Sequence, residues 1–123
     1  MTVRDLFPTR ICETSLAGQK GFATLLDDLE AACRMLEAED AAGRDWCRKN
    51  GYGGYTSYAS LDDLPRRATA FDDLKRRLDR LVAAYARDLN LDLGAGRLKM
   101  DSLWVNILKP GAGHSGHIHP HLS

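Results

Sequence analysis

The sequence predicts an α+β fold, because two helical patterns precede one extended, apolar stretch. Apolar residues recur at helical spacing over about 21–42 and 69–89, and an extended pattern covers 97–108. The chain has 123 residues, 44% of them hydrophobic, which suits one small domain with its own core and is too short for two. We therefore expect a single domain that spans residues 1–123.

Charge and composition argue against several classes of partner. The 17 basic residues are balanced by 17 acidic ones, so no excess of positive charge predicts nucleic-acid binding or attachment to a membrane surface. No apolar run of about 18 residues predicts a membrane span, and the first residues lack the apolar core of a secretory signal. Cys12, Cys33 and Cys47 form no CxxC pair, which predicts reduced thiols in a cytoplasmic protein.

The first predicted helix covers residues 21–42. Its apolar residues share one face and its acidic residues occupy the other, as on a helix with a solvated outer face. Gly43 suits a C-terminal stop for this helix. Ahead of it, Leu6, Phe7 and Ile11 lie in a short extended segment, and we expect them to pack on a sheet or a helix.

A segment rich in glycine and aromatic residues follows, between residues 45 and 60. Its aromatic residues are Trp46, Tyr52, Tyr55 and Tyr58. Glycine allows turns and close approach of the backbone, so these rings either fill a small core beneath a loop or cover a ligand pocket. Composition alone favours packing over the pocket.

Two helix starts are predicted after this segment. Ser60 followed by Asp63 has the pattern of a capping box and opens a short turn, which Pro65 limits. Thr69 is the expected N-cap of the second long helix, over residues 69–89.

Basic residues on this second helix are interleaved with aspartates. Asp72 precedes Arg76 by four positions, and Asp73 precedes Arg77 by the same spacing. Acid-before-base pairs at this spacing form ion pairs along a helix surface. The pattern therefore predicts a solvated, self-paired face in preference to a phosphate-binding site.

Residues 97–108 predict a strand. Leu103, Val105 and Ile107 alternate with residues of the opposite side that are also largely apolar, which predicts a central strand covered on both faces. Asn106 is polar within this run. If it is buried it must find hydrogen-bond partners, and otherwise it points toward a cavity.

All four histidines lie in the last ten residues. In an extended segment, His117 and His119 project to the same side and present two imidazoles to one metal ion. Imidazole is a suitable ligand for zinc, iron, copper and nickel alike, so the spacing does not identify the metal. The alternative is a histidine-containing tail that binds metal incidentally. No GxSxG, P-loop, GxGxxG or HExxH motif is present to favour a hydrolase, a nucleotide-binding protein or a zinc peptidase.

Several of these stretches together resemble the 2-oxoglutarate- and Fe(II)-dependent oxygenases of bacteria and phages, which are prolyl-hydroxylase-like proteins. The matching residues are Leu103-Trp104-Val105-Asn106-Ile107-Leu108, Gly111, Gly113 and His117-Ile118-His119-Pro120-His121. The run from Gly54 to Pro65 is similar as well, and the resemblance extends from about Leu6 onward.

This resemblance implies N-terminal helices followed by the first strands of a double-stranded β-helix, or jelly roll. His117 and His119 would be two ligands of an Fe(II) facial triad. Trp104 and Asn106 would lie beside the cofactor site, where 2-oxoglutarate and oxygen bind. The implied activity is decarboxylation of 2-oxoglutarate to succinate, coupled to hydroxylation of a substrate that is not known.

The family pattern continues after the H-P-H segment with a serine, an S-G-x-Y-Y strand, a distal histidine and a basic residue for 2-oxoglutarate. Leu122 and Ser123 stand there instead. We therefore expect the N-terminal part of such a domain, with an incomplete barrel and impaired activity. Two other hypotheses remain, a non-catalytic helical interaction module and a homodimer that completes a metal site with His117 and His119 of both copies.

Overall fold

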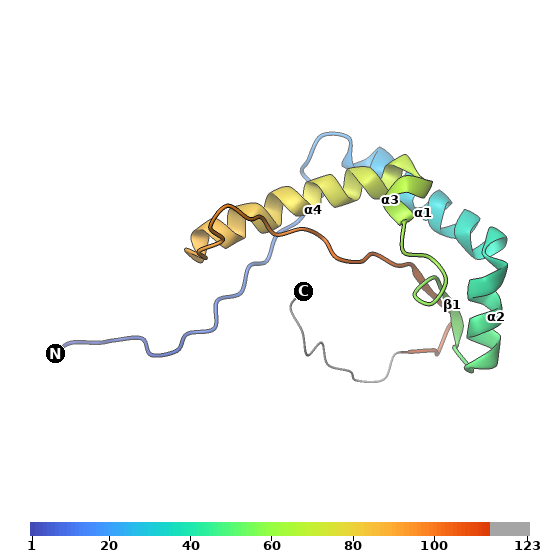
Figure 1. The fold of residues 1–123 in the computed structure, drawn as a ribbon, viewed down its shortest axis with the longest axis horizontal. Coiled ribbons are helices and arrows are strands. Elements are labelled where there is room, and N and C mark those ends of the chain that lie inside the picture. The colour runs from blue at the N-terminus through green and yellow to red at the C-terminus, as the bar shows by residue number, and fades with distance from the viewer. Residues whose placement is uncertain (114–123) are drawn as a thin grey trace.

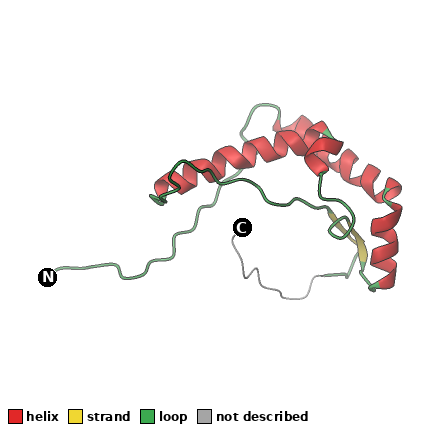
Figure 2. Cartoon of the chain, in the orientation of Figure 1, coloured by secondary structure: helices red, strands yellow, loops and turns green. Residues whose placement is uncertain are grey.

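The computed structural model describes residues 1–113, which contain four helices and two strands (Figure 2). They are α1 Phe22–Glu39, α2 Ala41–Lys49, β1 Gly54–Thr56, α3 Leu64–Arg67, α4 Thr69–Asp88 and β2 Asn106–Leu108. Helices together with a small sheet confirm the predicted α+β class. None of these helices combines the length and the apolar composition that crossing a membrane requires.

The helices form an arch, and the two strands lie beside α2 at one end of it (Figure 1). α1 packs against α4, and α2 packs against β1. After α4, the chain runs back along the inner side of the arch to β2 (Figure 1). β1 and β2 pair antiparallel, with Tyr55 opposite Ile107 and Thr56 opposite Asn106.

The single helix predicted over residues 21–42 is in fact two helices. α1 ends at Glu39 and α2 begins at Ala41, with Asp40 between them at φ −77° and ψ 82°. The carboxylate of Asp40 accepts a hydrogen bond from the backbone N–H of Gly43 at 2.9 Å, and so caps α2. Gly43, predicted as a helix stop, is instead a buried residue in the first turn of α2.

α4 confirms the second predicted helix and its self-paired charges. Asp72 and Arg76 form an ion pair at 3.0 Å, and Asp73 and Arg77 form one at 3.1 Å. Both pairs join neighbouring positions on the surface of one helix, which is why the sequence alone could predict them.

The predicted helix caps are wrong. Ala68, in extended geometry, occupies the N-cap position of α4, so Thr69 is the first helical residue and no side chain caps this end. Asp63 is the N-cap residue of α3 and makes no side-chain capping bond. Ser60 instead donates its hydroxyl hydrogen to the carboxylate of Asp40 at 2.6 Å, because the fold brings this distant acceptor within reach.

The strand predicted over residues 97–108 is regular only over its last three residues. β1 is three residues long, so it can pair with no more than that. The expectation of a strand covered on both faces is also wrong. Val105 is 6% exposed, but Leu108 is 39% exposed and Asn106 is exposed as well, because the helices cover only one side of the two-stranded sheet.

One hydrophobic core lies where α1, α3, α4 and the two-stranded sheet meet. Its buried residues are Ala32, Leu36, Tyr55, Leu64, Phe71 and Val105. Tyr55 is 2% exposed and Leu64 is fully buried. The packing hypothesis is therefore correct for Tyr55, which belongs to the aromatic-rich segment.

The N-terminal segment does not pack as predicted. Leu6, Phe7 and Ile11 are 77%, 99% and 79% exposed, and the segment extends away from the arch (Figure 1). It is held at Arg10, whose carbonyl oxygen accepts a hydrogen bond from the hydroxyl of Tyr85 at 2.7 Å. A two-stranded sheet offers too little apolar surface to cover these three side chains.

Candidate functional site

Trp104 and Asn106, the two residues predicted beside a cofactor site, lie in contact at the start of β2. The amide oxygen of Asn106 accepts from Nε1 of Trp104 at 3.2 Å, and its nitrogen donates to Oγ1 of Thr56 at 2.6 Å. An indole nitrogen can only donate, which sets this orientation of the amide. The same nitrogen lies 3.3 Å from the hydroxyl of Tyr52. We call Tyr52, Thr56, Trp104 and Asn106 the strand cluster.

Strand register accounts for half of this cluster. Thr56 and Asn106 are directly opposite across the antiparallel pair, so their side chains share one face of the two-stranded sheet. Asn106 was expected to be buried or to face a cavity. It is exposed, and the strand cluster supplies its hydrogen bonds.

Two further rings border the strand cluster. Tyr58 meets Trp104 edge to face, with ring centroids 5.3 Å apart and planes at 75°, and Tyr58 is 65% exposed. Trp46 lies beside Tyr52 at 6.5 Å and 55°. Aromatic pairs at such separations stabilise their arrangement by about 0.5–1.5 kcal/mol. The aromatic segment is therefore divided, with Tyr55 in the core and the other rings around the cluster.

Asp40 ties β1 and the loop after it to the junction of α1 and α2. Besides capping Gly43, its carboxylate accepts hydrogen bonds from the hydroxyls of Tyr55 at 2.9 Å and Ser60 at 2.6 Å. Burial opposes ionisation, but hydrogen bonds from Ser60, Gly43 and Tyr55 and the charge of Arg44 hold the pKa of Asp40 below its usual value. Burial, with the bond to Asp40, raises the pKa of Tyr55.

Sequence reasoning missed this role of Asp40, which it placed inside one helix over residues 21–42. A usable signal was present, since an aspartate three residues before a helical N–H is a common N-cap. The partners Tyr55 and Ser60 are 15 and 20 positions away, and no local pattern relates them to Asp40.

Cys47 closes the outer edge of β1. Its Sγ lies 3.2 Å from the backbone nitrogen of Thr56, which donates to it, and 3.8 Å from the carbonyl oxygen of Thr56, to which the thiol donates. Cys47 is 4% exposed. The structure thus gives this cysteine a packing role that fixes the position of Thr56 in the strand cluster.

The predicted metal ligands, His117 and His119, lie outside the described residues. Within residues 1–113, no three histidine, cysteine, aspartate or glutamate side chains gather into a group that could hold a metal ion. Residues 1–113 therefore supply no complete iron site of their own, and the prediction of iron binding rests on the histidine segment.

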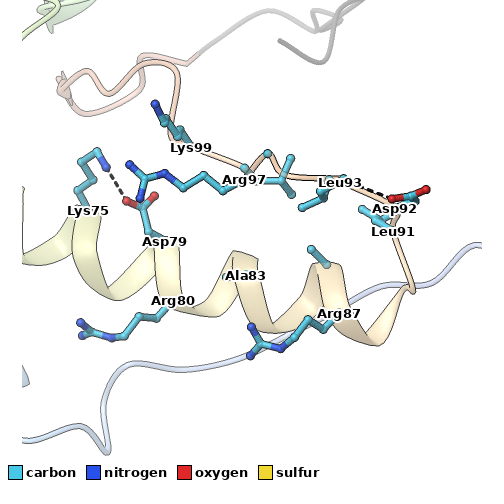
Figure 3. A pocket seen from close by; sticks show the side chains of 14 residues that line it. Lys75, Asp79, Arg80, Ala83, Arg87, Leu91, Asp92, Leu93, Arg97 and Lys99 are labelled. Atoms are coloured by element: carbon cyan, nitrogen blue, oxygen red, sulfur yellow. Dashed lines mark hydrogen bonds and ion pairs between the residues drawn. The ribbon is translucent and has the colours of Figure 1, made fainter.

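A cavity of about 630 Å³ lies between α4 and residues 91–99 (Figure 3). We call it the basic groove, and the residues that characterise it are Lys75, Asp79, Leu91, Leu93, Arg97 and Lys99. The sequence predicted only the start of a strand there, at residue 97. The alternation of leucine with polar residues after position 90 was the one signal that an accessible apolar surface follows the helix.

Comparison with protein-family models and with curated proteins finds no match to this chain.

Proposed function

We propose that the protein is a 2-oxoglutarate- and Fe(II)-dependent oxygenase-like protein, in which β1 and β2 are early strands of a double-stranded β-helix. One observation carries the proposal. Two stretches of the family resemblance that are about 50 residues apart, around Thr56 and around Asn106, pair as one two-stranded sheet and join their side chains in the strand cluster.

In this proposal His117 and His119 bind Fe(II), while Trp104 and Asn106 border the place for 2-oxoglutarate and oxygen. When bound, the metal would supply the redox chemistry that couples decarboxylation of 2-oxoglutarate to hydroxylation of the substrate. All four histidines lie in residues 114–121, so residues 1–113 cannot provide a distal histidine.

A cytoplasmic location forms part of the proposal. It is supported by the cysteines, since Cys12, Cys33 and Cys47 are all unpaired thiols. Proteins with unpaired thiols are common in reducing compartments.

The proposal is tested by titrating the full chain with Fe(II) under anaerobic conditions, with and without 2-oxoglutarate. Tryptophan emission and calorimetry report binding, and a succinate assay reports turnover. We expect the His117→Ala/His119→Ala variant to bind Fe(II) at least about tenfold more weakly, a loss of about 1.4 kcal/mol. The matched control is His114→Ala/His121→Ala, which should bind as the wild type does.

Equal Fe(II) affinity in the two double variants would overturn the assignment of the ligands. Failure of 2-oxoglutarate to bind in the presence of the metal would overturn the oxygenase proposal.

The second candidate function is a non-catalytic helical interaction module whose histidines bind metal incidentally. It is favoured by the leucines of the basic groove, because Leu91 and Leu93 are 49% and 38% exposed. It predicts that replacing His117 and His119 changes neither the stability nor any association of the protein.

A further inference from the structure

The basic groove exposes apolar side chains that the rest of the described chain does not cover. Leu91, Leu93 and Leu98 are 49%, 38% and 44% exposed, although all three line the groove. The backbone N–H of Leu91 donates to the carbonyl oxygen of Ala86 at 3.1 Å, which holds this part of the groove wall against α4. Adjoining apolar side chains in a hollow are a common feature of partner-binding surfaces.

One end of the groove is strongly basic. Figure 3 shows Lys75 and Arg97 beside Asp79, with Lys99 further along the same segment. Lys75 pairs with Asp79 at 2.5 Å. The charged groups of Arg97 and Lys99 have no ion-pair or hydrogen-bond partner among residues 1–113. A ligand of this groove should therefore carry negative charge next to an apolar group.

α1 has the complementary pattern on its outer surface. It contains five acidic residues and one arginine, whereas residues 75–99 contain seven basic residues and three acidic ones. Leu26 and Met35 of α1 are 54% and 40% exposed. Glu30 and Glu39 follow them by four positions, so each exposed apolar side chain adjoins a carboxylate on the helix surface.

We infer that the basic groove of one molecule binds the acidic outer face of α1 of a second copy. Within one molecule this contact is not available, because α1 packs near the start of α4, whereas residues 91–99 run back along α4 on the inner side of the arch (Figure 1). The formal net charge of the chain is zero, so no overall repulsion opposes association of two copies. The opposite charges are instead separated onto two surfaces that can meet only between molecules.

Two charge-reversed variants test this inference by sedimentation equilibrium at low ionic strength. Asp27→Lys/Glu30→Lys reverses the outer face of α1, and Arg97→Glu/Lys99→Glu reverses the groove. All four residues are exposed. We expect the wild type to self-associate, each variant alone to associate at least about tenfold more weakly, and an equimolar mixture of the two to regain association.

The control is Lys20→Glu/Lys109→Glu, which makes the same charge change as the groove variant on exposed residues outside both surfaces. It should associate as the wild type does, and added salt should weaken the association of both. A monomeric wild type, a control as weak as the groove variant, or a mixture that stays monomeric would each overturn the inference. Metal plays no part in these measurements, so their failure leaves the iron-binding proposal untouched.

Discussion

Replacing Asp40 by alanine should destabilise the protein more than any other exchange of one acidic residue on its helices. The side chain accepts three hydrogen bonds, from Gly43, Tyr55 and Ser60, at 2.9, 2.9 and 2.6 Å. A hydrogen bond to a charged group contributes about 1.5–3 kcal/mol, and an N-cap contributes about 1 kcal/mol. Because the three bonds share one carboxylate, their contributions overlap, and we expect a total loss of about 3–5 kcal/mol.

Asp40→Asn is the informative comparison. Asparagine caps a helix as well as aspartate does, so the bond to Gly43 is retained. Its NH₂ group replaces the oxygen that faces Tyr55 and Ser60, and both hydroxyls can accept from it after rotating. The charge is lost and the three bonds are partly kept. We expect a loss of about 1–2 kcal/mol.

The pH dependence of stability follows from the same carboxylate. The pKa of Asp40 is lowered in the folded protein, so Asp40 binds a proton more readily in the unfolded chain than in the folded protein. The stabilisation by ionised Asp40 is therefore complete above the unfolded pKa of about 3.9 and is lost as the pH falls through the folded value. Asp40→Asn has no such group, so the stability gap between it and the wild type should shrink in acid.

Urea unfolding followed by far-ultraviolet circular dichroism, at neutral pH and through the acid range, measures the two losses and the change of the stability gap with pH. The free energy of unfolding is compared for the wild type, Asp40→Ala and Asp40→Asn. The reasoning would be refuted by a loss below about 1 kcal/mol for Asp40→Ala, or by equal losses for the two variants. A stability gap that does not change with pH would refute the role of the charge.

Two glycine exchanges test the neighbouring contacts by the same unfolding assay. Gly43→Ala should gain about 1 kcal/mol of helix propensity, but its methyl group would overlap the carboxylate of Asp40 and lie 2.8 Å from Oγ of Ser60. We therefore expect a net loss of about 1–2 kcal/mol, and a net gain would contradict this account. Gly54→Ala would drive its methyl group into the carbonyl oxygen of Ile107, a backbone atom that cannot move without breaking the strand pair, so we expect a loss of about 2–3 kcal/mol. The control is Gly18→Ala, which should be nearly neutral because no atom lies within 4 Å of the added group.

The helices and their surface ion pairs could be predicted from the sequence, because both depend on residues three to four positions apart. The apolar stripe of α4 and the pair Asp73–Arg77 are of this kind. The break at Asp40 was missed, although the bond to Gly43 is a local N-cap, because the other two bonds of its carboxylate are not local. The residue that interrupts the helix is held by the distant side chains of Tyr55 and Ser60.

The candidate site divides in the same way. The sequence singled out Trp104 and Asn106, and the structure joins them through an amide that accepts from the indole. Their partners Tyr52 and Thr56 come from a segment that the sequence marked only as aromatic and glycine-rich. Strand register, which depends on how the two segments meet in space, decided which of its residues would take part.

The sequence by itself determined the α+β class, the position of α4 and the existence of a strand that ends at Leu108. Those features follow from the periodicity of apolar side chains, which each segment carries within itself. Only the tertiary structure decided that β2 would be short, that the segment around Phe7 would stay exposed and that a groove would form beside α4. Each of these depends on how much surface a neighbouring element offers, and that surface exists only once distant parts of the chain have packed together.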